Sequence, residues 1–232
     1  MKILVVGKCY GRLGFINQYI EESGAELVLA VSGVGATYNS MNDKEHFVDF
    51  LNRKSSFSRP VVTIVGPYDD WGLTKLLIEK KLSVPNFYLL GRSIKDTIDT
   101  MYVGLRGVTI SGIGGTYSPN SYNQNSVTGQ HQRHYRKKDI DNLASFRSHI
   151  VMMYDVIGES AKNKVDFGDD TIRLFREKRA FYTFIGKHSW FGYVNTGHHN
   201  VLTMPPIHKG YLIIDTAQEW NATCVMPKIT VN

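Results

Sequence analysis

The first ninety residues alternate short apolar runs with segments of helical periodicity, and this alternation limits the chain to few folds. The apolar runs lie at residues 3–6, 26–31, 61–65 and 87–90. The segments with apolar residues at helical spacing lie at 13–23, 44–53 and 73–82. Short runs of this kind, uncharged apart from Glu26 at the start of the second, suit strands buried on both faces of a sheet. The β-α-β-α-β-α-β order predicts an α/β fold with a parallel sheet, whose functional residues belong at the carboxyl ends of the strands.

From residue 101 onward the pattern changes. We expect further strands and helices at 103–110, 137–146, 150–154, 169–178 and 181–185. The glycines of 111–115 predict a tight turn, because they lack the Lys-Ser or Lys-Thr and the helix of a phosphate-binding loop. Residues 117–136 are polar, aromatic and long for a loop, which leaves an ordered functional excursion or a disordered one as alternatives. The tail at 193–231 alternates apolar and polar residues and predicts a β meander.

Composition limits the class of protein but not its ligand. With 232 residues, 42% of them hydrophobic, we expect one domain over 1–232 with a polar, basic excursion at about 117–138. No apolar run reaches the roughly 18 residues of a membrane span. The first residues lack a secretory pattern, and two isolated cysteines fit a reducing compartment. The net charge of +6 permits an acidic partner such as nucleic acid without requiring one.

Loops follow five of the expected strands, after Val6, Val31, Val65, Met153 and Ile185. Their glycines, apolar strands and spacing resemble the calcineurin-like metallophosphoesterases, and among these the small lariat-debranching-like members. The resemblance covers nearly the whole chain and implies a four-layer α/β/β/α sandwich. In that family, Asp, Asn and His residues at the strand ends hold two metal ions, which activate a water and neutralise charge on the phosphoryl group.

The ligand-bearing motifs of that family are replaced at each of these strand ends. The first family motif is Asp-x-His-Gly and the second is Gly-Asp; this chain has Lys8-Cys9-Tyr10-Gly11 and Ser32-Gly33-Val34-Gly35. The third is Gly-Asn-His followed by an acid, and here it reads Gly66-Pro67-Tyr68-Asp69. The fourth is His, often followed by Asp, and the last is Gly-His-x-His; here they read Tyr154-Asp155 and Gly186-Lys187-His188-Ser189.

None of the replacing residues is a good ligand for a hard divalent cation, which prefers carboxylate, imidazole or carbonyl groups. Lys8 and Lys187 also bring positive charge to the place where the cations would lie. The resemblance therefore implies the fold, whereas the residues imply an inactive member. We expect no catalytic residue, no bound metal and no cofactor.

Acids and histidines near the strand ends allow a second interpretation. A relocated metal site could use Asp69, Asp70, Asp155, His188, His198 and His199. Alternatively, Asp69 and Asp155 are loop acids paired with Lys8 or Lys187. We favour the paired acids, because no regular ligand spacing such as His-x-x-x-His is present.

The replaced strand ends also form a candidate anion or nucleotide site. Its residues are Lys8, Tyr10, Tyr68, Asp69, Tyr154, Asp155, Lys187 and His188. Lysines and phenols donate hydrogen bonds to phosphate, which makes anion binding chemically reasonable. The alternative, which we favour, is that these side chains fill and neutralise the former metal site.

The densest basic run is a candidate nucleic-acid site. It consists of Arg133, His134, Tyr135, Arg136, Lys137 and Lys138. Basic groups among aromatic rings bind single strands by phosphate contact and stacking. A solvated loop leading into a helix explains the same residues equally well.

Together these features favour a non-catalytic binding or regulatory protein whose partner is another protein, with no membrane association. One alternative is a module that binds RNA or single-stranded DNA. Another is a metal-dependent phosphodiesterase with a rebuilt site. We expect a cytoplasmic location, or the host cytoplasm if a phage encodes the chain. The oligomeric state stays open.

Overall fold

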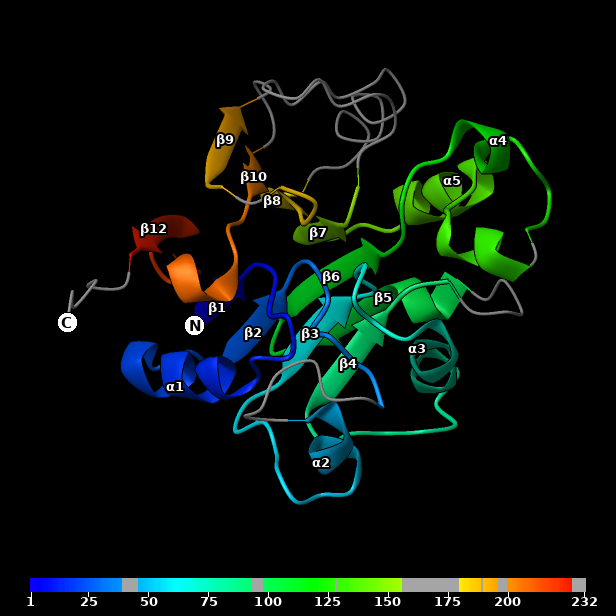
Figure 1. Ribbon diagram of the computed structural model, residues 1–232. Coiled ribbons are helices and arrows are strands. Elements are labelled where there is room, and N and C mark those ends of the chain that lie inside the picture. Colours follow the sequence, from blue (N-terminus) through cyan, green and yellow to red (C-terminus); the bar gives the residue numbers. More distant parts are fainter. Residues whose placement is uncertain are drawn as a thin grey trace.

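The computed structural model describes residues 1–38, 46–92, 98–127, 129–155, 180–188, 190–195 and 200–226. The expected helix at 169–178 lies outside these residues, as do Ser189, His198 and His199. Within them, the chain forms two mixed six-stranded sheets with a few helices (Figure 1). No helix in the described ranges is long and apolar enough to cross a membrane.

The first sheet contains the parallel strands that the β-α alternation predicts. Its four consecutive parallel strands are β1 (Lys2–Val6), β2 (Leu27–Ala30), β3 (Val61–Ile64) and β4 (Phe87–Leu90). The helices between them are α1 (Gly14–Ser23), α2 (Phe47–Leu51) and α3 (Trp71–Ile78). Every residue of β2 and β3 is buried, as expected for strands covered on both faces. The parallel sheet is therefore confirmed.

The second sheet has the order β5-β6-β7-β8-β10-β9. Its strands are β5 (Tyr102–Leu105), β6 (Val108–Ile113), β7 (Ile150–Met153), β8 (Tyr182–Ile185), β10 (Asn200–Thr203) and β9 (Gly192–Asn195). The four central strands β6, β7, β8 and β10 run parallel, and β5 and β9 are antiparallel edges.

The β5–β6 region differs from the sequence expectation. The single strand expected at 103–110 is wrong, because the chain reverses at Arg106 and Gly107, both at positive φ, to form a hairpin. The turn expected at 111–115 is also displaced, since residues 111–113 belong to β6. Gly112 has a packing role there: a Cβ at this position would lie 2.8 Å from Cγ2 of Ile64 on the first sheet.

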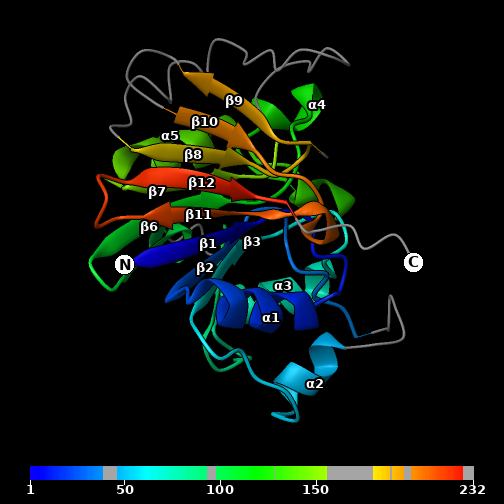
Figure 2. The same cartoon turned by 90° about the vertical axis from the view of Figure 1, so that its left-hand side faces the viewer.

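Three hydrophobic clusters separate four layers. In β1, Leu4 and Val6 pack toward α1, α2 and α3, whereas Ile3 and Val5 pack toward the second sheet. A third cluster, which includes Leu143, joins the outer face of the second sheet to α5 (Lys137–Ser145). Figures 1 and 2 show α1, α2 and α3 on one side of the paired sheets and α4 and α5 on the other. The four-layer α/β/β/α sandwich is confirmed.

The carboxyl-terminal tail is rich in strands, as expected, but it does not form one meander. The strands β9 and β10 belong to the second sheet, whereas β11 (Tyr211–Asp215) and β12 (Asn221–Val225) extend the first sheet beyond β1. The chain crosses between the sheets at Pro205 and Pro206, which cannot donate backbone hydrogen bonds to a ladder. Alternating hydrophobicity predicts strands but does not say which sheet each one joins.

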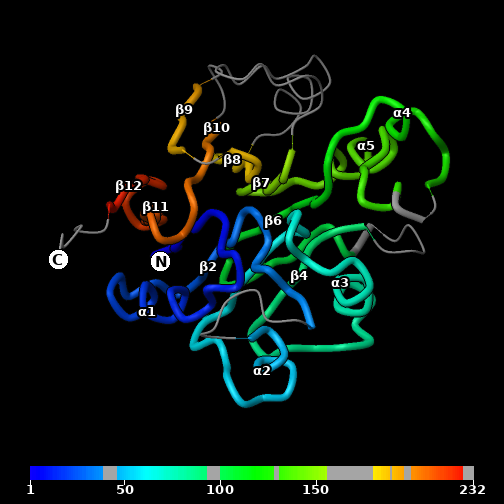
Figure 3. The backbone as a smooth tube through the Cα atoms, viewed as in Figure 1, coloured from blue at the N-terminus to red at the C-terminus, as the bar shows by residue number. Residues whose placement is uncertain are grey.

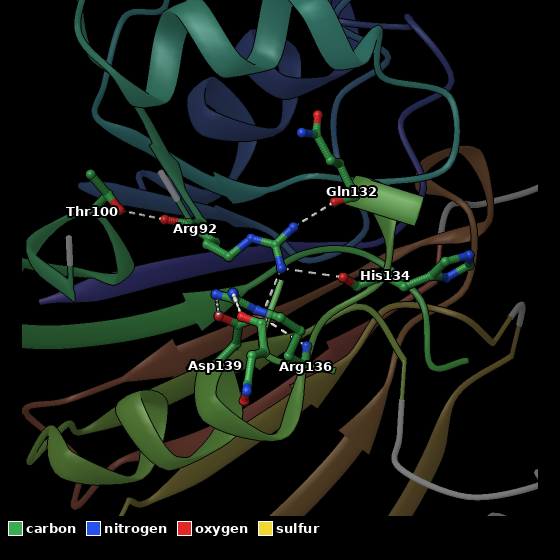
Figure 4. A network of polar contacts seen from close by, with 8 residues as sticks. Arg92, Thr100, Gln132, His134, Arg136 and Asp139 are labelled. Atoms are coloured by element: carbon green, nitrogen blue, oxygen red, sulfur yellow. Dashed lines mark hydrogen bonds and ion pairs between the residues drawn. The ribbon is translucent and has the colours of Figure 1, made fainter. Parts of the chain in front are cut away.

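The described parts of the 117–138 excursion are folded. They contain α4 (Pro119–Tyr122) and the 3₁₀ turn η2 (Gly129–Arg133), and they lead into α5 (Figure 3). A buried ionic network fixes this segment (Figure 4). Arg92, which follows β4, donates to Oδ2 of Asp139 at 2.8 Å and to the carbonyl oxygens of Gln132 and His134 at 2.8 and 3.3 Å. Of the two alternatives for this segment, the ordered one holds for its described residues.

Candidate ligand site at the strand ends

The loops after β1, β2 and β3 of the first sheet meet the loop after β8 of the second. The hydroxyl of Ser32 donates to the carbonyl oxygen of Gly186 at 2.7 Å. Gly66 lies so close to the β2 loop that a Cβ on it would lie 1.8 Å from the carbonyl oxygen of Ser32. A Cβ on Gly186 would lie 2.1 Å from the carbonyl oxygen of Val31. Only glycine fits these approaches, so the glycines of the loops set the architecture of the site.

The two lysines of the strand ends are bound within the protein. The Lys8 Nζ donates to the carbonyl oxygen of Lys187 at 2.7 Å. The Lys187 Nζ lies 3.0 Å and 3.1 Å from the two carboxylate oxygens of Asp155, which is almost fully buried. The backbone N–H of Tyr117 also donates to Asp155, at 3.1 Å. The expected pairing of Asp155 with a lysine is therefore confirmed, and the second positive charge of the site lies against the same loop.

Asp69 has a different role from the one expected. Its carboxylate accepts hydrogen bonds from the backbone N–H groups of Ala36 and Gly66, both at 2.6 Å, and no lysine of the described ranges pairs with it. The expected pairing of Asp69 with Lys8 or Lys187 is wrong, because the backbone donors of two tightly packed loops surround it. Burial raises the pKa of Asp69 to about 6, although these N–H groups favour its charged form. This carboxylate joins the β2 and β3 loops.

Three phenols occupy strand-end positions at which the family has histidines. The rings of Tyr10 and Tyr68 meet edge to face with centroids 4.8 Å apart. Tyr10 has a φ of +51°, which a non-glycine residue adopts at some cost. Burial, followed by the charges of Asp155, Tyr68 and Tyr10, raises the pKa of Tyr154 to about 12. Burial also raises the pKa of Tyr10, so Tyr10 and Tyr154 stay protonated at neutral pH and act as hydrogen-bonding groups.

His188 lies beside this site and is buried. Its ring centroid is 4.6 Å from that of Trp190, and its Nε2 has no hydrogen-bond partner in the described part of the chain. Burial, and then the positive charge of Lys187, lower the pKa of His188. A neutral imidazole at this position agrees with the positive surroundings.

The side chains at the strand ends do not fit a pair of metal ions. Lysine ammonium groups, phenols and Pro67 stand at the ligand positions, and the nearby carboxylates of Asp69 and Asp155 are engaged by backbone N–H groups and Lys187. Among the described residues, no group of three or more His, Cys, Asp or Glu side chains is arranged to hold a metal ion. Asp70 instead caps α3, where its carboxylate accepts from the backbone N–H of Leu73 at 2.7 Å.

A cavity of about 500 Å³ opens beside the strand ends. Its lining residues are Val65, Gly66, Pro67, Asp69, Trp71, Gly115, Thr116, His131, Arg133, His134 and Tyr154. It brings Asp69 and Tyr154 of the candidate anion site together with Arg133 and His134 of the basic run. The other candidate anion-site residues, including Lys8 and Lys187, do not line it. Trp71 was missed in the sequence, although its position directly after the β3 loop, at the start of a helix, was the available signal.

The basic run divides between the surface and the interior. Arg133, Lys137 and Lys138 are exposed. Tyr135 and Arg136 are buried, and Arg136 donates to both carboxylate oxygens of Asp139, at 2.8 and 3.1 Å. Because they are buried, Tyr135 and Arg136 are not part of a nucleic-acid-binding surface, contrary to the sequence expectation.

Comparison with known proteins identifies the fold. Neither a protein-family model nor a curated protein matches the sequence. The structure is similar to that of TT1561 from Thermus thermophilus, with 12% identity, coverage of 98% of this chain and 99% of that chain, and a TM-score of 0.65. It is also similar to GAP50 of Plasmodium, with 10% identity, coverage of 92% and 80%, and a TM-score of 0.57. A structure described as a novel archaeal phosphodiesterase is 12% identical over 97% of this chain and 99% of that chain, with a TM-score of 0.46.

The likenesses to TT1561 and GAP50, together with the layered sheets, show the fold. The chain has the α/β fold of the calcineurin-like metallophosphoesterases, the family that its strand ends resemble.

Proposed function

We propose that this chain is a non-catalytic binding protein built on the metallophosphoesterase fold. The observation that carries the proposal is the chemistry of the strand ends. Lys8 and Lys187 bring two positive charges into the place where the family holds its metal ions, and Asp155 already compensates one of them. A dication there would have to displace Lys187 from the buried carboxylate of Asp155 and would meet unfavourable positive charge.

A binding role uses the features that the fold retains. The glycine contacts between the loops and the hydrogen bonds of Asp69 fix the strand ends without a metal ion. GAP50 is described as the anchor in the inner membrane complex of Plasmodium, so this fold also occurs in a protein described as an anchor. We propose another protein as the partner, as expected from the sequence. The exposed aromatic residues Trp190 and Tyr193, the latter on the edge strand β9, offer anchor side chains for such a contact.

Elemental analysis combined with an activity assay tests the loss of catalysis. Protein purified without chelator is analysed for manganese, zinc, iron and nickel and assayed against bis-p-nitrophenyl phosphate with and without added Mn²⁺. We expect less than about a tenth of an equivalent of metal and no turnover above buffer.

A variant pair makes this result decisive. Stoichiometric metal together with turnover that Asp155→Asn abolishes would overturn the proposal. The matched control is Asp141→Asn, which removes an exposed carboxylate from α5. Turnover that neither variant changes would instead indicate a contaminating phosphodiesterase and would leave the metal content to decide.

A nucleic-acid-binding role is the second candidate. The exposed basic residues Arg133, Lys137 and Lys138 lie at and after η2, and Arg133 lines the cavity beside the strand ends. Binding of single strands through phosphate contacts should weaken steeply as salt rises, whereas binding of a protein partner through aromatic anchors should change little. Titration of a short RNA at low and high salt separates the two candidates.

A further inference from the structure

The cavity beside the strand ends has the size and lining of a ligand site. Its volume of about 500 Å³ falls within the range of roughly 300–1,000 Å³ that is typical of small-molecule sites. Its walls combine the aromatic side chains of Trp71 and Tyr154 with the polar side chains of Arg133, His134 and Thr116. These residues come from the start of α3, from the loops after β6 and β7, and from the turn η2 and the residue after it, so the cavity exists only in the folded chain.

The charge of the lining favours an anion. Two neighbouring arginines, Arg92 and Arg136, are bound by Asp139 and by backbone carbonyl oxygens. The side chain of Arg133, by contrast, is exposed and makes no hydrogen bond or ion pair with the described residues. The one acid in the lining, Asp69, has backbone N–H groups on both carboxylate oxygens. Arg133 therefore supplies a guanidinium that has no ion-pair partner in the described ranges, a group of the type that forms bidentate contacts with phosphate.

The basic wall of the cavity, formed by Arg133 and His134, is held in place before any ligand binds. The backbone N–H of Thr116 donates to the carbonyl oxygen of Arg133 at 3.1 Å, and the Thr116 hydroxyl lies 2.8 Å from Nδ1 of His134. Arg92 holds the carbonyl oxygens on either side of Arg133, at Gln132 and His134 (Figure 4). A fixed backbone reduces the entropy lost on binding, which increases affinity for a ligand that fits.

The aromatic walls favour a flat, apolar group in addition to an anion. Trp71 is oriented by its indole N–H, which donates to Oε1 of Gln132 at 3.0 Å. Tyr154 is almost fully buried and lines the same cavity. Stacking of a nucleic-acid base on an aromatic side chain contributes to binding independently of base identity.

We propose that this cavity binds a nucleoside phosphate without a metal ion, with Arg133 on the phosphate and the Trp71 and Tyr154 walls against the base. The shared chemistry allows two sources, a free mononucleotide or a nucleotide unit of a single strand. This proposal rests on the proposed function in one respect: the phosphate contact, like the binding role, requires no metal ion.

Calorimetric titration of the full chain in EDTA tests the proposal. The probes are AMP, adenosine, inorganic phosphate and a ten-nucleotide deoxyadenosine strand. We expect saturable binding of AMP or of the strand, whichever is the source, and at least about tenfold weaker binding of adenosine and phosphate. Trp71→Phe should remove most of the ligand-induced change in tryptophan fluorescence, because the other two tryptophans do not line the cavity.

Arginine variants locate the phosphate contact. Arg133→Ala should weaken binding by about ten- to a hundredfold, the range expected for lost hydrogen bonds to a charged group, and Arg133→Lys should weaken it less. Arg147→Ala is the matched control, since it removes an exposed arginine from the loop before β7, and binding should be unchanged.

Three results would overturn the proposal: no saturable binding of AMP or the strand, equal loss in the Arg133→Ala and Arg147→Ala variants, or phosphate binding as tight as AMP binding. The proposed function fails by a different result, namely stoichiometric metal with phosphodiesterase turnover. Arg133-dependent binding in EDTA would support the cavity site even in that case, so the two failures are distinguishable.

Discussion

Replacing Asp139 should destabilise the protein more than any surface change on the same helix. The side chain of Asp139 is 1% exposed and lies between the guanidinium groups of Arg92 and Arg136, which are 12% and 4% exposed. Removing one partner of a buried ion pair leaves charge uncompensated and costs about 3–5 kcal/mol. Arg92 and Arg136 keep backbone acceptors, which places the expected cost of Asp139→Ala near the lower end, about 3 kcal/mol.

Urea denaturation measures this cost as a change in the free energy of unfolding. In a chain of this length, about 3 kcal/mol corresponds to a lower Tm by roughly 6–12 °C. Asp141→Ala, an exposed position on α5, is the control and should change stability by less than about 0.5 kcal/mol. A loss below about 1 kcal/mol for Asp139→Ala, or a loss equal to that of the control, would refute the assignment of the network as the support of the basic wall.

The pH dependence of the network has a defined sign. Burial raises the pKa of Asp139, but the hydrogen bond from Arg136 and the charge of Arg92 outweigh burial and leave the pKa below its usual value. The ionised form is therefore favoured in the folded state. Its stabilisation is present above the ordinary pKa of an unfolded aspartate, about 3.9, and is lost as pH falls below that value. The difference between the parent protein and Asp139→Ala should accordingly shrink in acid.

Two further predictions concern the strand ends. Burial raises the pKa of Asp69 to about 6, so the folded state binds more protons than the unfolded state between about pH 4 and pH 6. The free energy of unfolding should therefore fall as pH rises through that window. Urea denaturation at several pH values measures this slope, and Asp69→Asn should flatten it. Gly66→Ala should lower the Tm sharply or prevent folding, because its Cβ would lie 1.8 Å from the carbonyl oxygen of Ser32. In the control Gly104→Ala the nearest atom to the new Cβ lies at 4.0 Å, so the Tm should change little. Equal stability of these two glycine variants would contradict the close packing of the loops.

The fold was largely predictable because its signals are local. Buried parallel strands are short apolar runs, and Gly66 and Gly186 mark where such strands end. The hairpin at Arg106 and Gly107 was missed because the residues on either side both have strand character, and the reversal depends on positive φ at two adjacent positions. The sheet joined by β11 was not predictable, because the pairing of β11 with β1 links residues at opposite ends of the chain.

The candidate site was predictable in its residue types and less so in its contacts. The spacing of Arg136 and Asp139, three residues apart, is a local signal for the ion pair that buries this arginine. Arg92 gives no such signal, because it reaches the same carboxylate from 47 positions away. For the same reason the cavity could not be inferred: Tyr154 and Arg133 became neighbours only through the packing of separate loops.

At the strand ends, the positions that the fold requires to be glycine differ from the positions at which the family has its metal ligands. At Gly66 and Gly186, backbone segments approach each other so closely that a side chain would collide with a carbonyl oxygen. The requirement for glycine at these two positions does not depend on a metal ion. The ligand positions face no such demand, and here Lys187 and Asp155 satisfy each other. An internal ion pair at these positions is therefore compatible with the sandwich. Beside these loops lies a cavity with polar and aromatic walls, and this is where we propose that a ligand binds without a metal ion.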